Sequence, residues 1–149
     1  MPIAPYEDIV VSEYPQVRER IAELLATLVC EGAMEPTVIT EGLRSENGPY
    51  LETMTQAAAD LAESDPNLLS ASIPDLIALL DFEEFHYTIC GAAATALGHL
   101  DATEAVEPLC DLYAAYTDID SEDLLGTDII IQPRVAKALD RIEAVPVRV

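Results

Sequence analysis

The sequence predicts an all-α fold, and more specifically an α-α superhelix, or solenoid, of about three helical hairpins. Three observations support this prediction: apolar residues recur at helical spacing, alanine-rich segments recur along the chain, and aromatic residues are few. Half of the 149 residues are apolar and tryptophan is absent. At this length one compact domain is expected, spanning residues 1–149, with a core of Leu, Ile, Val and Ala.

The first 50 residues begin with an irregular arm. Residues 1–15 contain three prolines and little periodicity, so no regular element is expected there. A first helix is expected over 16–31, because Pro15 suits a helix start and Gly32 supplies a stop. Its inward-facing residues are expected to be Val17, Ile21, Leu24, Leu25 and Leu28.

Two helices separated by a turn are expected next. A short helix is predicted over 37–44, and the breaker residues 45–49 follow it. A longer helix is then predicted over 50–64, with Leu51, Met54, Ala58 and Leu61 on one stripe.

A helix interrupted by proline is expected in the middle of the chain. Asp65 can cap a helix start, and Pro66 suits the first turn. The helix is predicted over 68–80, and Pro74 within it should kink or interrupt it because a backbone hydrogen bond is lost there.

Three further helices complete the prediction. An alanine-rich helix is expected over 85–99, after an acidic link at 81–84. Another is expected over 103–116, with Tyr113 among its inward residues. The last helix is expected to follow a lead-in at about 129–131 and to end near Ala144.

The alanine-rich segments indicate an internal repeat. Three of them share a signature, namely AADLAES, ATALGHL and AKALDRI, and their leucines Leu61, Leu97 and Leu139 lie 36 and 42 residues apart. Two-helix units at such a period indicate a solenoid in which each hairpin covers the next. The expected repeats span about residues 16–64, 66–100 and 102–144.

The repeat also carries a family resemblance. The stretch LIALLDFEEFHYTICGAAATALGHLDATEAVEPLCDLY, from Leu76, resembles the HEAT-like repeat of the phycobilisome-lyase class. The match extends from about Ala57 to Tyr116 and recurs more weakly to Ala144. It departs from the pattern at Tyr87-Thr88, where Val-Arg usually opens the second helix. The resemblance implies the fold, whereas such repeats serve many different partners.

The charge is strongly negative. With 28 acidic against 7 basic residues, the net charge is −21, and Lys137 is the only lysine. This composition is typical of proteins from salt-accumulating halophiles, so we expect a halophilic archaeon as the source. So acidic a chain disfavours nucleic acid and anionic membranes as partners, because both require clustered basic residues.

The cysteines indicate a reduced, cytoplasmic protein. Cys30, Cys90 and Cys110 form no CxxC pair, and each is expected to pack as a small hydrophobic residue within a helix. A catalytic pair of Cys90 with His86 is disfavoured, because a reactive thiol needs exposure. No signal peptide or transmembrane segment is expected.

No catalytic, cofactor-binding or metal-binding residue is expected. His86 and His99 point to different helix faces and lack the His-Glu dipeptide with which HEAT-like hydroxylases hold iron. The acidic stretch near residue 120 starts like a calcium loop, but Asp123 and Ile129 stand where that loop requires Gly and Glu.

The C-terminal helix differs from the rest in charge. Arg134, Lys137 and Arg141 share one helix face. Residues 134–149 hold four basic and two acidic residues, a net +2, which leaves −23 for the rest. One interpretation is favourable charge near a helix C-terminus and attraction to the acidic body. The other is a docking patch for an acidic partner or a second copy.

The resemblance also implies a partner-binding face. In HEAT-type stacks the second helix of each hairpin lines the concave side. The leading function is therefore a non-enzymatic protein-protein interaction scaffold or adaptor with an unknown protein partner. The alternatives are an enzyme or enzyme subunit of the bilin-lyase-like class, and a self-associating structural protein. By registration, the face includes Glu52 and the candidate residues Gln56, Glu63, Thr88, Thr95, His99, Arg134, Lys137 and Arg141.

Overall fold

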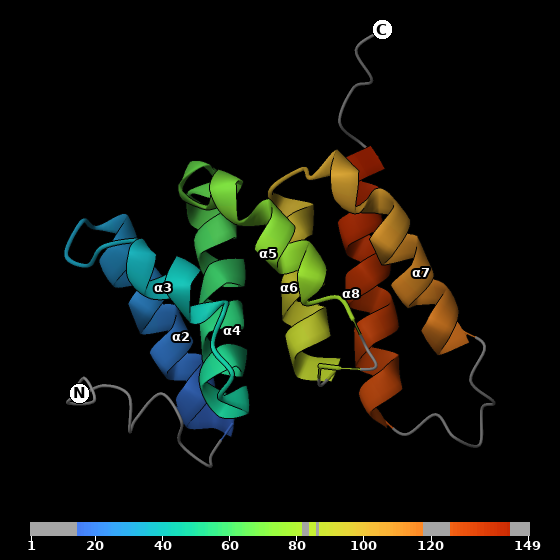
Figure 1. Ribbon diagram of the computed structural model, residues 1–149, viewed down its shortest axis with the longest axis horizontal. Helices are drawn as coiled ribbons and strands as arrows, with labels where there is room; N and C mark the ends of the chain where they lie inside the picture. Colours follow the sequence, from blue (N-terminus) through green and yellow to red (C-terminus); the bar gives the residue numbers. More distant parts are fainter. Residues whose placement is uncertain (1–14, 82–83, 86, 118–125, 144–149) are drawn as a thin grey trace, which may run out of the picture.

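All regular secondary structure in the described part of the chain is helical. A computed structural model describes residues 15–81, 84–85, 87–117 and 126–143, with the backbone alone at 15, 87, 115–117, 126–133 and 143. These residues form seven α-helices and two 3-10 helices and no strand (Figure 1). The all-α prediction is therefore confirmed. Within the same residues, no helix is long and apolar enough to cross a membrane.

Each predicted helix has a counterpart in the structure, with shifts of a few residues at the ends. In chain order the elements are α2 (Pro15–Cys30), α3 (Thr37–Gly42), α4 (Gly48–Ser64), η1 (Pro66–Ser72), α5 (Ile73–Ala78), α6 (Tyr87–His99), η2 (Thr103–Ala105), α7 (Val106–Thr117) and α8 (Gly126–Glu143). The predicted acidic loop after α7 lies outside the described residues.

Proline interrupts the middle of the chain as expected. The segment predicted as one helix is divided into the 3-10 helix η1 and the α-helix α5, and Pro74 lies in the first turn of α5. There its missing N–H costs no helical hydrogen bond. Asp65, predicted as a cap, forms no side-chain cap hydrogen bond. A side-chain cap is found at a different helix, α4. There the Asn47 side chain accepts a hydrogen bond from the Tyr50 backbone N–H at 3.1 Å.

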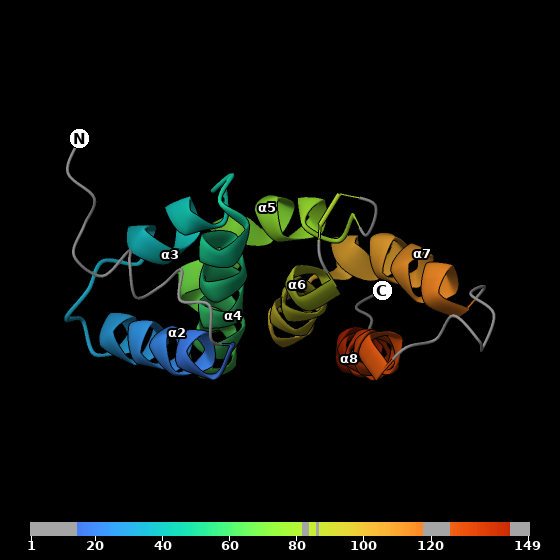
Figure 2. The same cartoon turned by 90° about the horizontal axis from the view of Figure 1, so that it is seen from below.

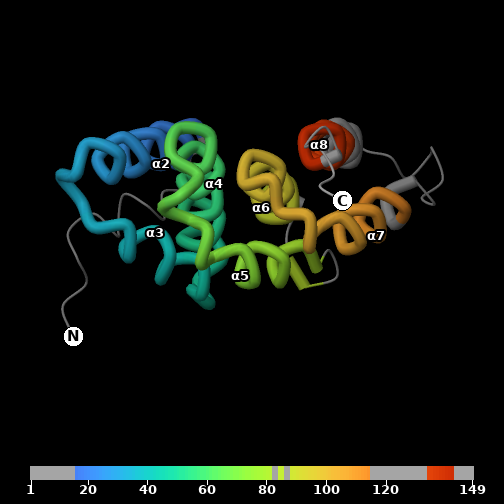
Figure 3. Tube along the Cα trace, turned by 90° about the horizontal axis from the view of Figure 1, so that it is seen from above, coloured from blue at the N-terminus to red at the C-terminus, as the bar shows by residue number. Residues whose placement is uncertain are grey.

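The helices form two layers (Figures 2 and 3). Helices α2, α4, α6 and α8 form one layer, called here the even layer. Their N-to-C directions are parallel (Figure 1). Helices α3, α5 and α7 form the other, called here the odd layer. Contacts are most extensive between neighbours in the even layer, and α3, α5 and α7 pack onto α4, α6 and α8, respectively. The even layer therefore forms the continuous body of the molecule.

Small residues allow the even layer to pack closely. Ala57, Ala58 and Ala93 are fully buried. A Cβ atom added at Gly98 of α6 would lie 2.8 Å from the Ala138 Cα of α8. Real Cβ atoms do not approach a backbone so closely, so glycine at this position permits the α6–α8 contact.

Three residues predicted to face inward are exposed. Val17 and Leu24 of α2 are 38% and 52% exposed, and Tyr113 of α7 is 40% exposed. Helix α2 lies at the end of the even layer, so α4 covers only part of its apolar circumference (Figure 2). The buried positions of α2 are Ala22, Leu25, Ala26 and Val29.

The cysteine prediction is correct for one residue and wrong for two. Cys90 is fully buried in α6, and burial raises the pKa of its thiol to about 12, with a further increase from Asp81. Cys30 and Cys110 are exposed. Cys30 is the last residue of α2, and Cys110 follows the buried Leu109, which places it off the buried stripe of α7.

Candidate functional site

A charged pocket lies across α4, α6 and α8. It has a volume of about 210 Å³. Seven of the eight candidate residues line it, whereas Thr88 does not. The sequence analysis did not include Ala59, Asp60 and Ala138, which also line it. The seven predicted residues are Gln56 and Glu63 on α4, Thr95 and His99 on α6, and Arg134, Lys137 and Arg141 on α8.

The α4 wall is acidic. Gln56, Asp60 and Glu63 recur at spacings of four and three, so they lie on one stripe of the helix. This spacing could have identified Asp60 from the sequence. Glu52, one turn before Gln56, instead pairs with Arg18 of α2 at 3.4 Å.

Asp60 is the most perturbed carboxyl of this wall. Burial raises its pKa to about 6, and the negative charges of Glu23 and Glu63 raise it further. A hydrogen bond from Gln56 and the charge of Arg134 act in the opposite direction. The Asp60 Oδ2 atom is buried and has no hydrogen-bond partner in the described part of the chain. A buried acceptor of this kind is costly to leave unsatisfied.

The α8 wall is basic. Arg134, Lys137 and Arg141 recur at spacings of three and four, so they form one stripe. The stripe extends for about 10 Å at 1.5 Å per residue. Arg134 is half-buried, whereas Lys137 and Arg141 are exposed. Among the residues whose side chains are described, none of these three forms an ion pair.

The other described basic residues are all paired. Their ion pairs are Arg18–Glu52 at 3.4 Å, Arg20–Glu23 at 3.4 Å and Arg44–Asp75 at 3.2 Å. The chain has seven basic residues, and the remaining one, Arg148, lies outside the described ranges. The basic groups without an ion pair in the described part of this very acidic chain are therefore gathered at one pocket.

Helix α6 forms the middle of the pocket. Burial lowers the pKa of His99, Arg141 and Lys137 lower it further, and Glu63 and Asp101 oppose this effect. A neutral imidazole is thus favoured, with one nitrogen able to donate and the other able to accept a hydrogen bond. The Thr95 hydroxyl donates to the Gly91 backbone carbonyl at 3.0 Å. Between them, the α6 residues contribute polar groups but no full charge.

The pocket continues into a second hollow toward α2. This hollow, of about 480 Å³, shares Asp60 and Glu63 with the first and is also lined by Glu23 and Glu31. The lining therefore changes from acidic in this hollow, at Glu23, Glu31, Asp60 and Glu63, to basic at α8.

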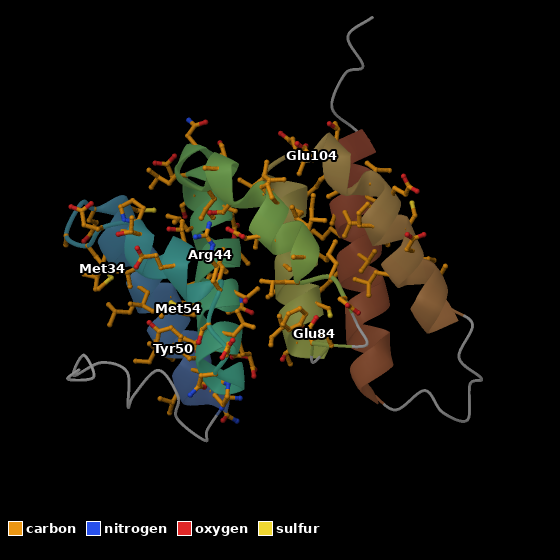
Figure 4. The ribbon with its side chains drawn as sticks, viewed as in Figure 1. Met34, Arg44, Tyr50, Met54, Glu84 and Glu104 are labelled. Carbon is orange, nitrogen blue, oxygen red and sulfur yellow. The ribbon has the colours of Figure 1, made fainter. Side chains whose placement is uncertain are left out.

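A larger hollow lies on the odd layer. It has a volume of about 670 Å³ and is lined by apolar residues that include Leu79 and Phe85. The Arg44–Asp75 ion pair also borders it, so these two charges neutralise each other. Figure 4 shows Arg44 and Glu84 on the side that faces the viewer, which is the side of α3, α5 and α7. This hollow is thus separate from the charged pocket of the even layer.

The charged pocket presents charged and hydrogen-bonding side chains. Its polar groups are carboxylates, basic groups, an amide, an imidazole and a hydroxyl, none of them paired as a nucleophile with an adjacent base. Within the described ranges, no three His, Cys, Asp or Glu side chains gather as a metal site would require. His86 and the stretch compared with a calcium loop lie outside those ranges.

No protein-family model matches this chain, and no curated protein matches it.

Proposed function

We propose that this chain is a non-enzymatic protein-interaction module, a short HEAT-like scaffold or adaptor that binds a partner protein along its even layer. One observation carries the proposal. Seven residues selected from the repeat registration line one pocket, although they come from three helices separated by links of more than 20 residues. Random surface positions on three helices would not be expected to converge in this way.

The arrangement of the helices supports the HEAT-like part of the proposal. Hairpins that stack in one direction produce two layers of helices, with each layer running in one direction. The even layer and the odd layer have this relation, and neighbours in the even layer make the most extensive contacts. We therefore interpret the chain as a short α-α solenoid with the charged pocket on its concave side.

The continuation of the pocket along the even layer favours a protein partner over an enclosed small substrate. Pockets that enclose small molecules usually have volumes of about 300–1,000 Å³ and bury most of the ligand. The charged pocket, at about 210 Å³, is smaller than this and holds one or two side chains of a partner. It also continues into the acidic hollow beside α2, so a longer segment has room along the layer.

The proposed setting is the cytoplasm of a halophilic archaeon. A net charge of −21 on 149 residues produces strong self-repulsion in dilute buffer, which concentrated salt screens. The exposed carboxylates are distributed over α2, α4, α7 and the links. Such a surface remains hydrated in molar KCl, where a less charged protein would precipitate.

The proposal is tested by obstructing the pocket. Thr95→Trp places a bulky, uncharged side chain in the middle of the pocket, and Thr103→Trp makes the same chemical change at an exposed position on η2. We expect Thr95→Trp to abolish co-purification of the partner at native salt, and Thr103→Trp to retain it. Equal capture by both variants would contradict the proposal. Circular dichroism shows whether each variant keeps its helices.

A second candidate function is self-association. On α2, Val17, Ile21, Leu24 and Leu28 recur at spacings of four, three and four, which is the apolar pattern of a helix-pairing seam. Val17 and Leu24 are exposed. If a second copy covers this stripe, Leu24→Lys will convert a dimer to a monomer in sedimentation. A monomeric wild-type chain would exclude this function.

A further inference from the structure

We infer that the charged pocket is a receptor for an acidic segment of a partner protein. Arg134, Lys137 and Arg141 bind the carboxylates of this segment, and Asp60 accepts a hydrogen bond from a donor side chain on its neighbouring edge. This inference rests on the proposed function, because it specifies the chemistry of the partner that the even layer binds. It also predicts the orientation of the segment, with its acidic edge toward α8 and its donor edge toward α4.

The first argument is the state of the basic residues. In a chain with 28 acidic residues, a basic side chain readily finds a carboxylate, as Arg18, Arg20 and Arg44 do. The three basic residues of α8 form no ion pair in the described part of the chain. Their positive charges are therefore available to an anionic ligand, and they converge on a pocket where that ligand would be partly desolvated.

The second argument is the shape of the basic stripe. It extends for about 10 Å along α8, or roughly two helical turns. A single phosphate or free carboxylate would occupy only part of this length. A row of carboxylates on a peptide segment, spaced three and four residues apart if the segment is helical, matches the stripe along its length. A segment of acidic residues therefore fits better than a small anion.

The third argument is the opposite wall. The Asp60 Oδ2 atom is buried and has no hydrogen-bond partner in the described structure, although it borders the pocket. A partner that carried only carboxylates would face Asp60 and Glu63 and be repelled by them. A Gln, Asn or Lys side chain on the neighbouring edge of the segment would satisfy Oδ2 instead. The two walls together select a segment with distinct edges.

The test uses synthetic peptides of about 14 residues, which form roughly four helical turns. The acidic peptide carries Glu at spacings of three and four along one edge and Gln along the adjacent edge. The inverted peptide carries Lys in place of each Glu. Binding is measured by fluorescence anisotropy at the lowest KCl concentration that gives the full helical circular dichroism signal, with free glutamate and inorganic phosphate as competitors.

The matched variants are Arg141→Glu in the pocket and Arg20→Glu on α2, which change the net charge equally. We expect the acidic peptide to bind the wild-type chain, and Arg141→Glu to weaken binding by about tenfold or more. Arg20→Glu should change binding by less than about twofold. Replacing the Gln edge with Ala should weaken binding to the wild-type chain more than to Asp60→Ala, as a double-mutant cycle measures.

Several results would overturn the inference. The acidic peptide could fail to bind, or the inverted peptide could bind with the same affinity. Arg141→Glu and Arg20→Glu could weaken binding equally. Free glutamate or phosphate could also compete as effectively as the unlabelled peptide. Partner capture distinguishes the two proposals. Capture blocked by Thr95→Trp but unaffected by Arg141→Glu would retain the protein-binding face and reject the acidic segment.

Discussion

The two ends of the molecule use basic residues in opposite ways. At the N-terminal end, Arg18, Arg20 and Arg44 each form an ion pair with an acidic residue of the same or a neighbouring element. At the C-terminal end, the three basic residues of α8 border a pocket and form no ion pair with a described residue. The residue types are the same, so the difference lies in the carboxylates within reach of each basic residue.

The neighbouring helices explain this difference. Helix α4 presents Glu52 to α2, and Arg18 pairs with it. Helix α6, which packs most extensively on α8, contains no Asp or Glu in its sequence YTICGAAATALGH. Without a carboxylate on α6, the basic stripe of α8 lacks an intramolecular partner there. We conclude that Arg18, whose ion pair is largely buried, supports the fold, and we propose that the basic residues of α8 serve binding.

The largest expected effect is that of salt on the whole fold. Raising KCl from low to molar concentration should raise the melting temperature, because screening relieves the repulsion behind the net charge of −21. If ion pairs dominated the stability, the melting temperature would fall with KCl, since screening weakens them. A melting series by circular dichroism compares the two. A melting temperature that is flat or falls with KCl would mean that pairing outweighs repulsion and would contradict the halophilic setting.

The next effect concerns the contact that forms the pocket. Gly98→Ala introduces a Cβ that would lie 2.8 Å from the Ala138 Cα, so α6 and α8 must separate. We expect a loss of about 1–3 kcal/mol in the free energy of unfolding. The control is Gly48→Ala, whose Cβ would have nothing within 4 Å. Chemical denaturation measures both. Equal stability of the two variants would show that the helices do not approach as closely as described.

Removing one basic residue from each end tests the comparison itself. The Arg18 and Glu52 side chains are only 14% and 26% exposed, so Arg18→Ala should lower the free energy of unfolding by about 1 kcal/mol or more. Lys137→Ala, with the same change in charge, should alter it by less than about 0.5 kcal/mol. Equal losses, measured by urea denaturation, would mean that the α8 residues also support the fold.

The smallest expected effect depends on pH. The pKa of Asp60 is about 6 in the folded chain against an ordinary 3.8, so the folded state holds this proton more tightly. This contribution to stability is present near pH 4 and is lost as the pH rises through 6. Asp60→Asn should therefore be more stable than the wild type above pH 6, by less than about 1 kcal/mol because the carboxyl is half-exposed.

The control for Asp60 is Glu63→Gln, which removes one negative charge from an exposed position of the same helix. It distinguishes the burial of Asp60 from the general relief of negative charge. Thermal melts at about pH 4.5 and about pH 7.5 provide the comparison. The gain in melting temperature from Asp60→Asn could be the same at both pH values, or no larger than the gain from Glu63→Gln. Either result would contradict a raised pKa for Asp60.

Most of the fold could be predicted from periodicity and breakers. The helices over 15–30, 48–64 and 87–99 follow from apolar spacing, and the interruption at Pro74 follows from its missing N–H. The exposure of Leu24 could not be predicted in this way. A helical period identifies an apolar face, but burial also requires a neighbour, and α2 lies at the end of its layer.

The candidate site was predictable in its members but not in its chemistry. Registration of the repeat identified seven of the pocket residues, whereas Thr88 and Glu52, which it also placed on that face, do not line the pocket. Asp60 could have been added from its spacing. The burial of its Oδ2 atom and the absence of ion pairs between α8 and the other described residues depend on distances between helices. Those distances are fixed by close contacts such as the one at Gly98, which a helical pattern alone does not reveal.

The most direct test of the central claim is a charge exchange across the pocket. Arg141→Glu should lose affinity for the acidic peptide, and a peptide with one matching Glu replaced by Lys should recover part of that affinity. The same peptide should bind the wild-type chain more weakly than the acidic peptide does. Recovery specific to the Arg141→Glu variant would show that the basic stripe contacts a carboxylate of the ligand. No recovery at any peptide position, or equal recovery with Arg20→Glu, would contradict the claim.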